Sequence, residues 1–130
     1  MSNTLPAILL LEADAATQEL YRRELSRHFQ VYTCRDENEA LQRLRTADIR
    51  AVVLEPEWAG GQGWHFLTAL NQASERPRVP IIICSVLDER RTGYQLGVAA
   101  YCVKPVPPTI LLTALRQALA SEPEMSVERR

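Results

Sequence analysis

Short apolar runs that alternate with segments of helical spacing constrain the fold of this chain more than any other feature. Three of the five runs are almost continuous in Ile, Leu and Val, which is typical of strands buried on both faces of a parallel sheet. The runs are residues 7–11, 29–34, 51–54, 81–84 and 100–103. We therefore predict five parallel strands.

The segments between and after these runs predict five helices, because their apolar residues recur at helical spacing. The predicted helices are residues 15–28, a segment that opens at Asp36, residues 64–72, residues 88–96 and a segment that starts at Pro107 or Pro108. Asp36 followed by Glu39 has the pattern of a capping box. The first helix is expected to bury one stripe, made of Ala16, Leu20, Tyr21 and Leu25.

Strands that alternate with helices predict right-handed crossovers and a doubly wound α/β sheet with strand order 2-1-3-4-5. In such sheets the functional crevice lies beyond the carboxyl ends of the strands, at the switch point between strands 1 and 3. Residues that directly follow the strands are therefore the first candidates for a function. They are Glu12, Ala13, Asp14, Glu55, Ser85, Lys104 and Pro105.

The composition narrows the function classes. A net charge of −1, from 15 basic and 16 acidic residues, argues against a general binder of nucleic acid or membrane surfaces. No apolar run approaches the roughly 20 residues of a membrane span, and the polar start does not have the pattern of a signal peptide. The three cysteines lack the paired spacing of a disulfide framework or a zinc site. We expect a cytoplasmic domain over residues 1–120, followed by a polar tail or linker stub over 121–130.

Two segments at the fourth and fifth predicted strands carry a family resemblance. They are VPIIICSV (79–86) and GVAAYCVKP (97–105). The pattern resembles the receiver domains of response regulators in two-component signalling, and the resemblance covers about residues 7–120. In that family strand 4 ends in a threonine or serine, and strand 5 carries an aromatic residue followed by Lys-Pro, usually joined by a cis bond. The resemblance implies a flavodoxin-like fold, with Ser85 and Tyr101 as the switch residues and Lys104 as the family's lysine.

The first and third strands depart from the family pattern. In the family, strand 3 ends in the aspartate that takes a phosphoryl group from a histidine kinase, and strand 1 ends in an acidic pair that holds magnesium. The segment AVVLEPEWAGGQG (51–63) places Glu55 at the position of that aspartate. At strand 1, Glu12 keeps the first acid and Ala13 replaces the second. Asp14 completes the acidic pocket in the sequence, but we expect it to cap the first helix.

These departures predict a pseudo-receiver that signals without being phosphorylated. Magnesium requires near-ideal octahedral coordination at about 2.0–2.1 Å, so Ala13 predicts weak or absent binding and no cofactor. Glu55 carries its carboxylate about one bond length further out, roughly 1.5 Å, which is a poor position for attack on a phosphodonor. There it could pair with Lys104 and accept a hydrogen bond from Ser85. Such a pair would hold an active-like arrangement of Ser85 and Tyr101 permanently.

Other interpretations of the same residues stay open. Glu55 and Lys104 could form a purely structural ion pair, Ser85 could cap a helix, and Tyr101 could be an ordinary core aromatic. The first functional alternative is a working receiver that uses magnesium and accepts phosphate on Glu55 or a neighbouring residue. The second is a small-molecule enzyme on a flavodoxin-like sheet, although no base–nucleophile pair is visible in the sequence.

The expected mode of action is a protein contact and not catalysis. The partner would be a histidine kinase or an effector domain, and homodimerisation is an open alternative. In the family the interaction face consists of helix 4, strand 5 and helix 5, which here would present Arg90, Arg91, Tyr94 and Arg116. Trp58 and Trp64 flank a Gly-Gly turn, where a partner contact and packing on the third helix are equally open.

Overall fold

The computed structural model describes residues 4–72 and 79–121 of the protein. Its five strands form one parallel sheet with the order β2-β1-β3-β4-β5, as predicted. The strands are β1 (Ala7–Leu11), β2 (Gln30–Thr33), β3 (Ile49–Leu54), β4 (Ile81–Ser85) and β5 (Ala100–Val103). The carboxyl ends of all five strands therefore lie along the same edge of the sheet.

Six helices lie within the described ranges, one more than predicted. They are α1 (Ala15–Leu25), α2 (Glu37–Thr46), α3 (Trp58–Gly61), α4 (Gly63–Gln72), α5 (Arg90–Gln95) and α6 (Pro108–Ala120). The additional helix is α3, a single turn in which Ala59 and Gly60 have positive φ angles of 56° and 72°. It is a bent connection between β3 and α4, too short to give a periodic signal in the sequence.

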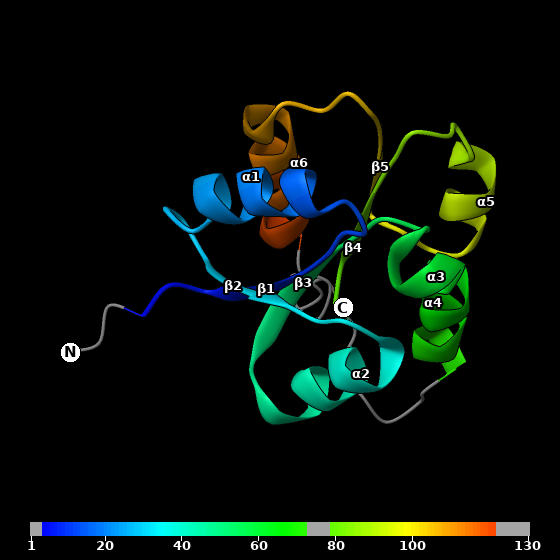
Figure 1. Ribbon diagram of the computed structural model, residues 1–130, viewed down its shortest axis with the longest axis horizontal. Coiled ribbons are helices and arrows are strands. Elements are labelled where there is room, and N and C mark those ends of the chain that lie inside the picture. The colour runs from blue at the N-terminus through cyan, green and yellow to red at the C-terminus, as the bar shows by residue number, and fades with distance from the viewer. Residues whose placement is uncertain (1–3, 73–78, 122–130) are drawn as a thin grey trace, which may run out of the picture.

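Helices cover both faces of the sheet, so the molecule has three layers (Figure 1). Helices α1 and α6 pack on one face, where Ile8 and Leu10 of β1 meet Tyr21 and Leu115. The other helices pack on the opposite face, which buries the alternate residues of the same strands. This two-sided burial explains why the strand sequences are continuously apolar.

The helix ends follow the predicted caps. Asp14 accepts a hydrogen bond from the backbone N–H of Thr17 at 2.9 Å and begins α1. Asp36 accepts from the N–H of Glu39 at 2.9 Å, and the Glu39 carboxylate accepts in return from the N–H of Arg35 at 2.8 Å. The capping box is therefore present, although Glu39 reaches one residue beyond the expected N–H group.

Two of the four residues predicted to form the buried stripe of the first helix are exposed. Tyr21 and Leu25 are buried, but Leu20 is 39% exposed and Ala16 is also exposed. Successive residues of an α-helix lie about 100° apart, so Leu20 falls on the flank of the face that Tyr21 centres. The helix also ends at Leu25, three residues before the predicted end.

The predicted domain end at residue 120 coincides with the last residue of α6. The predicted tail, apart from its first residue, lies outside the described residues. Within the described ranges, none of the helices combines the length and the apolar composition needed to cross a lipid bilayer.

Candidate functional site at the carboxyl ends of the strands

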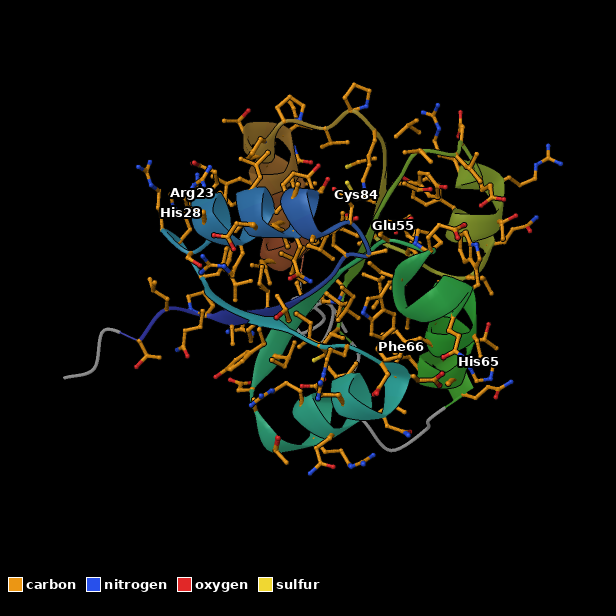
Figure 2. All side chains as sticks on the ribbon, in the orientation of Figure 1. Arg23, His28, Glu55, His65, Phe66 and Cys84 are labelled. Atoms are coloured by element: carbon orange, nitrogen blue, oxygen red, sulfur yellow. The ribbon has the colours of Figure 1, made fainter. Side chains whose placement is uncertain are left out.

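Buried polar side chains gather at one place in the described part of the chain. Glu12, Glu55 and Ser85 are the three polar residues that are almost completely buried there, and they follow or end β1, β3 and β4. Lys104, directly after β5, reaches the same place. Figure 2 shows Glu55 at this edge of the sheet, beside the start of α3. Burying polar groups is costly unless they are hydrogen-bonded, so the contacts of these four residues define the site.

Lys104 forms its ion pair with Glu12, and the predicted pair with Glu55 is wrong. The Lys104 Nζ lies 2.9 Å from the Glu12 Oε1, and the two side chains are only 15% and 3% exposed. The second oxygen of Glu12 accepts from the backbone N–H of Asp14 at 3.0 Å. A buried carboxylate needs a counter-charge, and Lys104 supplies it to Glu12.

Glu55 turns its carboxylate back toward its own loop. Its Oε2 accepts from the backbone N–H of Glu57 at 3.0 Å. Burial raises the pKa of Glu55, and the negative charge of Glu12 raises it further, against the lowering effects of the Glu57 N–H and the Lys104 ammonium. Glu55 therefore holds its proton to a higher pH than an ordinary glutamate does.

Ser85 and Tyr101 both bind the backbone of Leu87, a residue that the sequence did not single out. The Ser85 Oγ accepts from the Leu87 N–H at 3.1 Å, and the Tyr101 hydroxyl donates to the Leu87 carbonyl at 2.7 Å. The same hydroxyl accepts from the N–H of Glu89 at 3.0 Å. The two switch residues thus hold both backbone groups of Leu87. The expected bond between Ser85 and Glu55 is not formed, and Ser85 does not cap α5, because Leu87 lies in the turn before that helix.

Tyr101 lies inward because α5 leaves room for its ring. A Cβ atom on Gly93 would lie 2.8 Å from the Tyr101 Cδ2, closer than such contacts permit. The glycine that weakens the sequence signal of this helix is therefore required by packing. The Tyr94 hydroxyl accepts from the Tyr101 backbone N–H at 3.1 Å. Tyr101 packs in the core as the structural interpretation expected, and its hydroxyl also organises the loop.

The loop after β3 packs tightly and internally. A Cβ on Gly63 would lie 2.6 Å from the Pro56 Cα, so only glycine fits there, and the Gly63 N–H donates to the Pro56 carbonyl at 3.1 Å. Trp58 is 2% exposed and donates from Nε1 to the Cys34 carbonyl at 2.9 Å. Its ring also meets Phe66 edge to face. Trp58 is therefore a core residue and not a partner contact, and Trp64 is packed against the same core.

The acidic residues at this edge already have protein partners. Glu12 is committed to Lys104, and Ala13 supplies no oxygen ligand from its side chain. Asp14 accepts two hydrogen bonds from Thr17, which lower the pKa of its carboxyl. In residues 4–72 and 79–121, no group of three His, Cys, Asp or Glu side chains is arranged to hold a metal ion. Magnesium is usually held by one or two carboxylates together with waters, so binding here would compete with the Lys104–Glu12 ion pair.

The predicted interaction face is divided between two places. Arg90, Arg91 and Tyr94 lie on α5 at the surface, with Tyr94 51% exposed and Arg90 paired to Asp88. Arg116 lies on α6, and its guanidinium donates to the His28 Nδ1 at 3.2 Å, beyond the end of α1. The structure therefore groups the α5 residues and directs Arg116 toward α1.

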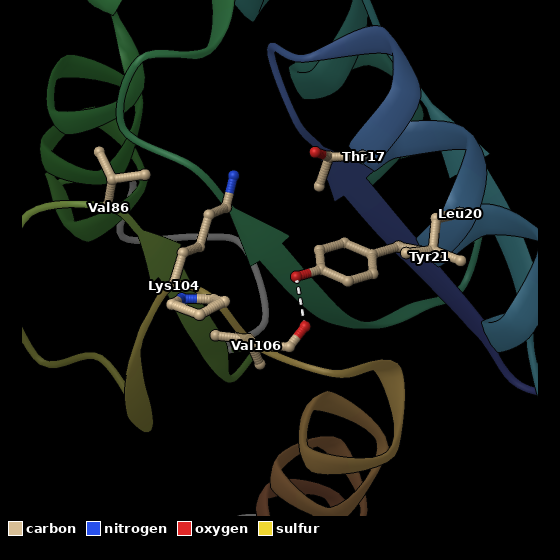
Figure 3. A pocket seen from close by; sticks show the side chains of 7 residues that line it. Thr17, Leu20, Tyr21, Val86, Lys104 and Val106 are labelled. Atoms are coloured by element: carbon tan, nitrogen blue, oxygen red, sulfur yellow. Dashed lines mark hydrogen bonds between the residues drawn. The ribbon is translucent and has the colours of Figure 1, made fainter.

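A cavity of about 440 Å³ opens beside the site, between α1 and the loops that follow β4 and β5 (Figure 3). Its lining residues are Thr17, Leu20, Tyr21, Val86, Lys104, Pro105 and Val106. The Tyr21 hydroxyl donates to the Val106 carbonyl at 2.8 Å and ties α1 to the loop after β5. The Lys104–Pro105 peptide bond in that loop is cis, as the family resemblance implied. The cavity lacks a lining residue from the loop after β3, so it lies beside the crevice and not within it.

Comparisons with known proteins point to one family. The family model described as the response regulator receiver domain matches residues 8–116. The chain is similar to the chemotaxis response regulator CheY4 of Vibrio cholerae, with 21% identity and a TM-score of 0.76 over 88% of this chain and 99% of that chain. A response regulator from Thermotoga maritima gives 19% identity and a TM-score of 0.76 over 90% and 99%. The bacteriophytochrome response regulator RtBRR gives 25% identity and a TM-score of 0.74 over 88% and 78%. No curated protein matches the chain.

Proposed function

The chain belongs to the response regulator receiver domain family of two-component signalling, and we propose that it is a receiver that signals without being phosphorylated. The observation that carries this proposal is that Ser85 and Tyr101 are both hydrogen-bonded to the backbone of Leu87. The resemblance implies that these two switch positions move together when a receiver is phosphorylated. Here protein groups alone hold them together on one loop residue.

The chemistry of the acceptor position supports the proposal. Transfer of a phosphoryl group to a carboxylate needs in-line geometry and a positive charge that neutralises the phosphoryl oxygens. Glu55 is turned toward the Glu57 N–H and lies near the negative charge of Glu12. The nearest fixed cation, Lys104, is already neutralised by Glu12. A phosphodonor would therefore meet a carboxylate that already accepts a hydrogen bond, beside a lysine that is already paired.

The position of Tyr101 supports a fixed conformation. Its ring packs against the place where Gly93 lacks a side chain, and its hydroxyl has two backbone partners in the loop between β4 and α5. Turning the ring outward would leave the N–H of Glu89 and the carbonyl of Leu87 without those partners. Two such losses cost about 1–3 kcal/mol in total, enough to keep the outward state a minor population. The fixed state depends on Leu87, and not on the Glu55–Lys104 pair that the sequence suggested.

The output of this fixed state would be a protein contact. A histidine kinase or an effector domain is the proposed partner, in the cytoplasm where two-component signalling operates. The proposed contact surface is built on α5 and the neighbouring β5, around Arg90, Arg91 and Tyr94. A second copy of the chain could use the same surface. Because the Tyr94 hydroxyl accepts from the Tyr101 backbone N–H, a partner that touches Tyr94 would contact a residue bonded to the strand that carries Tyr101.

The working-receiver alternative has one observation in its favour. Glu55, Ser85 and Lys104 still occupy the corresponding strand ends, so a phosphodonor could in principle meet a carboxylate, a hydroxyl and an ammonium group. The enzyme alternative has less support. The cavity beside the site has two titratable side chains in its lining, and Lys104 is committed to Glu12 while burial raises the pKa of Tyr21.

Magnesium binding separates the proposal from the working receiver. The melting temperature is measured with millimolar magnesium, alone and with beryllium fluoride as a mimic of the phosphoryl group. We expect no change for the natural sequence. A ligand at a hundredfold excess over its Kd stabilises a protein by about 2.7 kcal/mol, which would shift the melting temperature by several degrees. The Ala13→Asp, Glu55→Asp double variant is the positive control, and a clear shift in the natural protein would contradict the proposal.

A further inference from the structure

Two cysteines face each other across neighbouring strands. Cys84 of β4 and Cys102 of β5 are Cα partners in the parallel register. Both side chains belong to the face that α1 and α6 cover, and Cys84 is labelled in Figure 2 near the candidate site. Neighbouring strands lie about 4.7–4.9 Å apart, inside the range of roughly 4.4–6.8 Å that a disulfide spans between Cα atoms. The register therefore places the two Cα atoms within the span of a disulfide.

We propose that Cys84 and Cys102 form an oxidation site at which a peroxide joins β4 and β5 through a reversible disulfide. In the first step the Cys102 sulfur attacks one peroxide oxygen, the O–O bond breaks, and a sulfenic acid and one water form. The Cys84 sulfur then attacks the Cys102 sulfur and releases the second water. Two thiols and one hydrogen peroxide thus give one disulfide and two waters, and the peroxide accepts both electrons.

The order of the two steps follows from exposure. Cys102 is half-buried, while Cys84 is fully buried, with its Sγ 3.7 Å from the Tyr21 hydroxyl. Tyr21 lines the cavity in Figure 3, and its side chain lies between the cavity and Cys84. An oxidant from solvent reaches Cys102 first, and Cys84 is placed to act as the resolving thiol.

The rate is expected to be slow at neutral pH and to rise with pH. Burial raises the pKa of Cys84 to about 11 and also raises the pKa of Cys102, so both groups are mainly protonated thiols at pH 7. The thiolate is the reactive species. A disulfide between in-register neighbours in a parallel sheet also departs from relaxed geometry, which makes it easy to reduce. Slow formation and easy reduction suit a bond that forms only under sustained oxidation.

The disulfide would lie between the two switch residues. Cys84 immediately precedes Ser85, and Cys102 immediately follows Tyr101. Drawing the two sulfurs together would shift the strand ends from which both side chains reach Leu87. Oxidation is therefore expected to change the loop between β4 and α5, whether or not the domain is ever phosphorylated.

The test uses the natural protein, with hydrogen peroxide at pH 7 and pH 9, followed by thiol alkylation and mass spectrometry. We expect a loss of two hydrogen atoms, a Cys84–Cys102 cross-linked peptide, faster reaction at pH 9 and full reversal by dithiothreitol. Cys34 belongs to the core on the opposite face of the sheet, so Cys34→Ser is the matched control and should react like the natural protein. Cys102→Ser and Cys102→Ala should form no internal disulfide.

Three outcomes would overturn the proposal. The first is oxidation of Cys102 to sulfinic or sulfonic acid while Cys84 keeps a free thiol. The second is a dimer joined through Cys102 as the only disulfide product. The third is a disulfide that forms at a rate proportional to the unfolded fraction in low urea, because the native register would then play no part in its formation.

Discussion

The Lys104 ammonium and the Glu12 carboxylate form a 2.9 Å ion pair from which solvent is almost excluded. This pair connects the ends of two strands that lie three strand spacings apart, since Lys104 follows β5 and Glu12 follows β1, with β3 and β4 between them. The pair joins the two ends of the candidate site. It also neutralises the Lys104 ammonium, which is then not available to a phosphoryl group at Glu55. The pair therefore links the stability of the fold to the chemistry that the site can perform.

Breaking this pair from one side should destabilise the protein strongly. Lys104→Met leaves the Glu12 carboxylate buried without a counter-charge, and such changes cost about 3–5 kcal/mol. Adding Glu12→Gln should restore part of the lost stability, because the effects of substitutions at the two residues of one ion pair are not additive. Urea unfolding of the two single variants and the double variant measures both effects. Arg90→Gln removes the exposed pair with Asp88 and serves as the control, with no measurable change expected.

Gly93→Ala should displace Tyr101 from its inward position. The added methyl group would lie 2.8 Å from the Tyr101 ring, so the ring must move and its hydroxyl must leave Leu87. The protein should lose stability even though alanine is better in a helix than glycine by about 1 kcal/mol. Fluorotyrosine NMR should report the new ring environment, with Thr92→Ala in the same helix as the control. An unchanged Tyr101 signal would show that Gly93 is not what admits the ring.

The ionisation of Glu55 should make the protein less stable as the pH rises. Because burial raises the folded-state pKa of Glu55, its protonated form is favoured by folding. That contribution is fully present below the unfolded pKa of about 4.3 and is lost as the pH rises through the higher folded value. Glu55→Gln should therefore stabilise the protein at pH 7, and the difference from the natural protein should shrink toward pH 4.

Urea unfolding between pH 4 and pH 8 measures this difference. Glu89→Gln changes an exposed side chain on the neighbouring loop and serves as the control, and we expect its effect on stability to stay within about 0.5 kcal/mol. If Glu55→Gln were less stable than the natural protein at every pH, the Glu55 carboxylate would be a favourable charge in the folded state. That result would contradict the proposed cost of ionising Glu55 in the folded state.

The strand ends could be predicted from the sequence, but their contacts could not. Continuous burial of β1, β3 and β4 on both faces fixes a parallel sheet, and the sheet order brings Glu12, Glu55 and Lys104 to one edge. Which carboxylate the lysine chooses depends on side-chain geometry, because a long flexible lysine can reach across several strands. The sequence pattern carries no information on that choice.

Two other features were missed for different reasons. The role of Leu87 lies in its backbone N–H and carbonyl, which every non-proline residue possesses, so its side chain gives no signal. Leu20 fitted an apolar stripe, but the stripe was centred on the wrong residue, and Leu20 instead lines the cavity beside Tyr21.

The most direct measurement is labelling with acetyl phosphate in the presence of magnesium, followed by mass spectrometry of residue 55. The natural protein, Glu55→Asp and Ala13→Asp should all remain unlabelled or nearly so, since each lacks an acceptor of the right length, a magnesium ligand or both. Only the Ala13→Asp, Glu55→Asp double variant should gain one phosphoryl group, a strongly non-additive result expected of residues that serve one site. If Glu55→Asp alone is labelled as well as the double variant, then another acid serves the metal. If the natural protein itself is labelled, the proposal of a phosphorylation-independent receiver is contradicted.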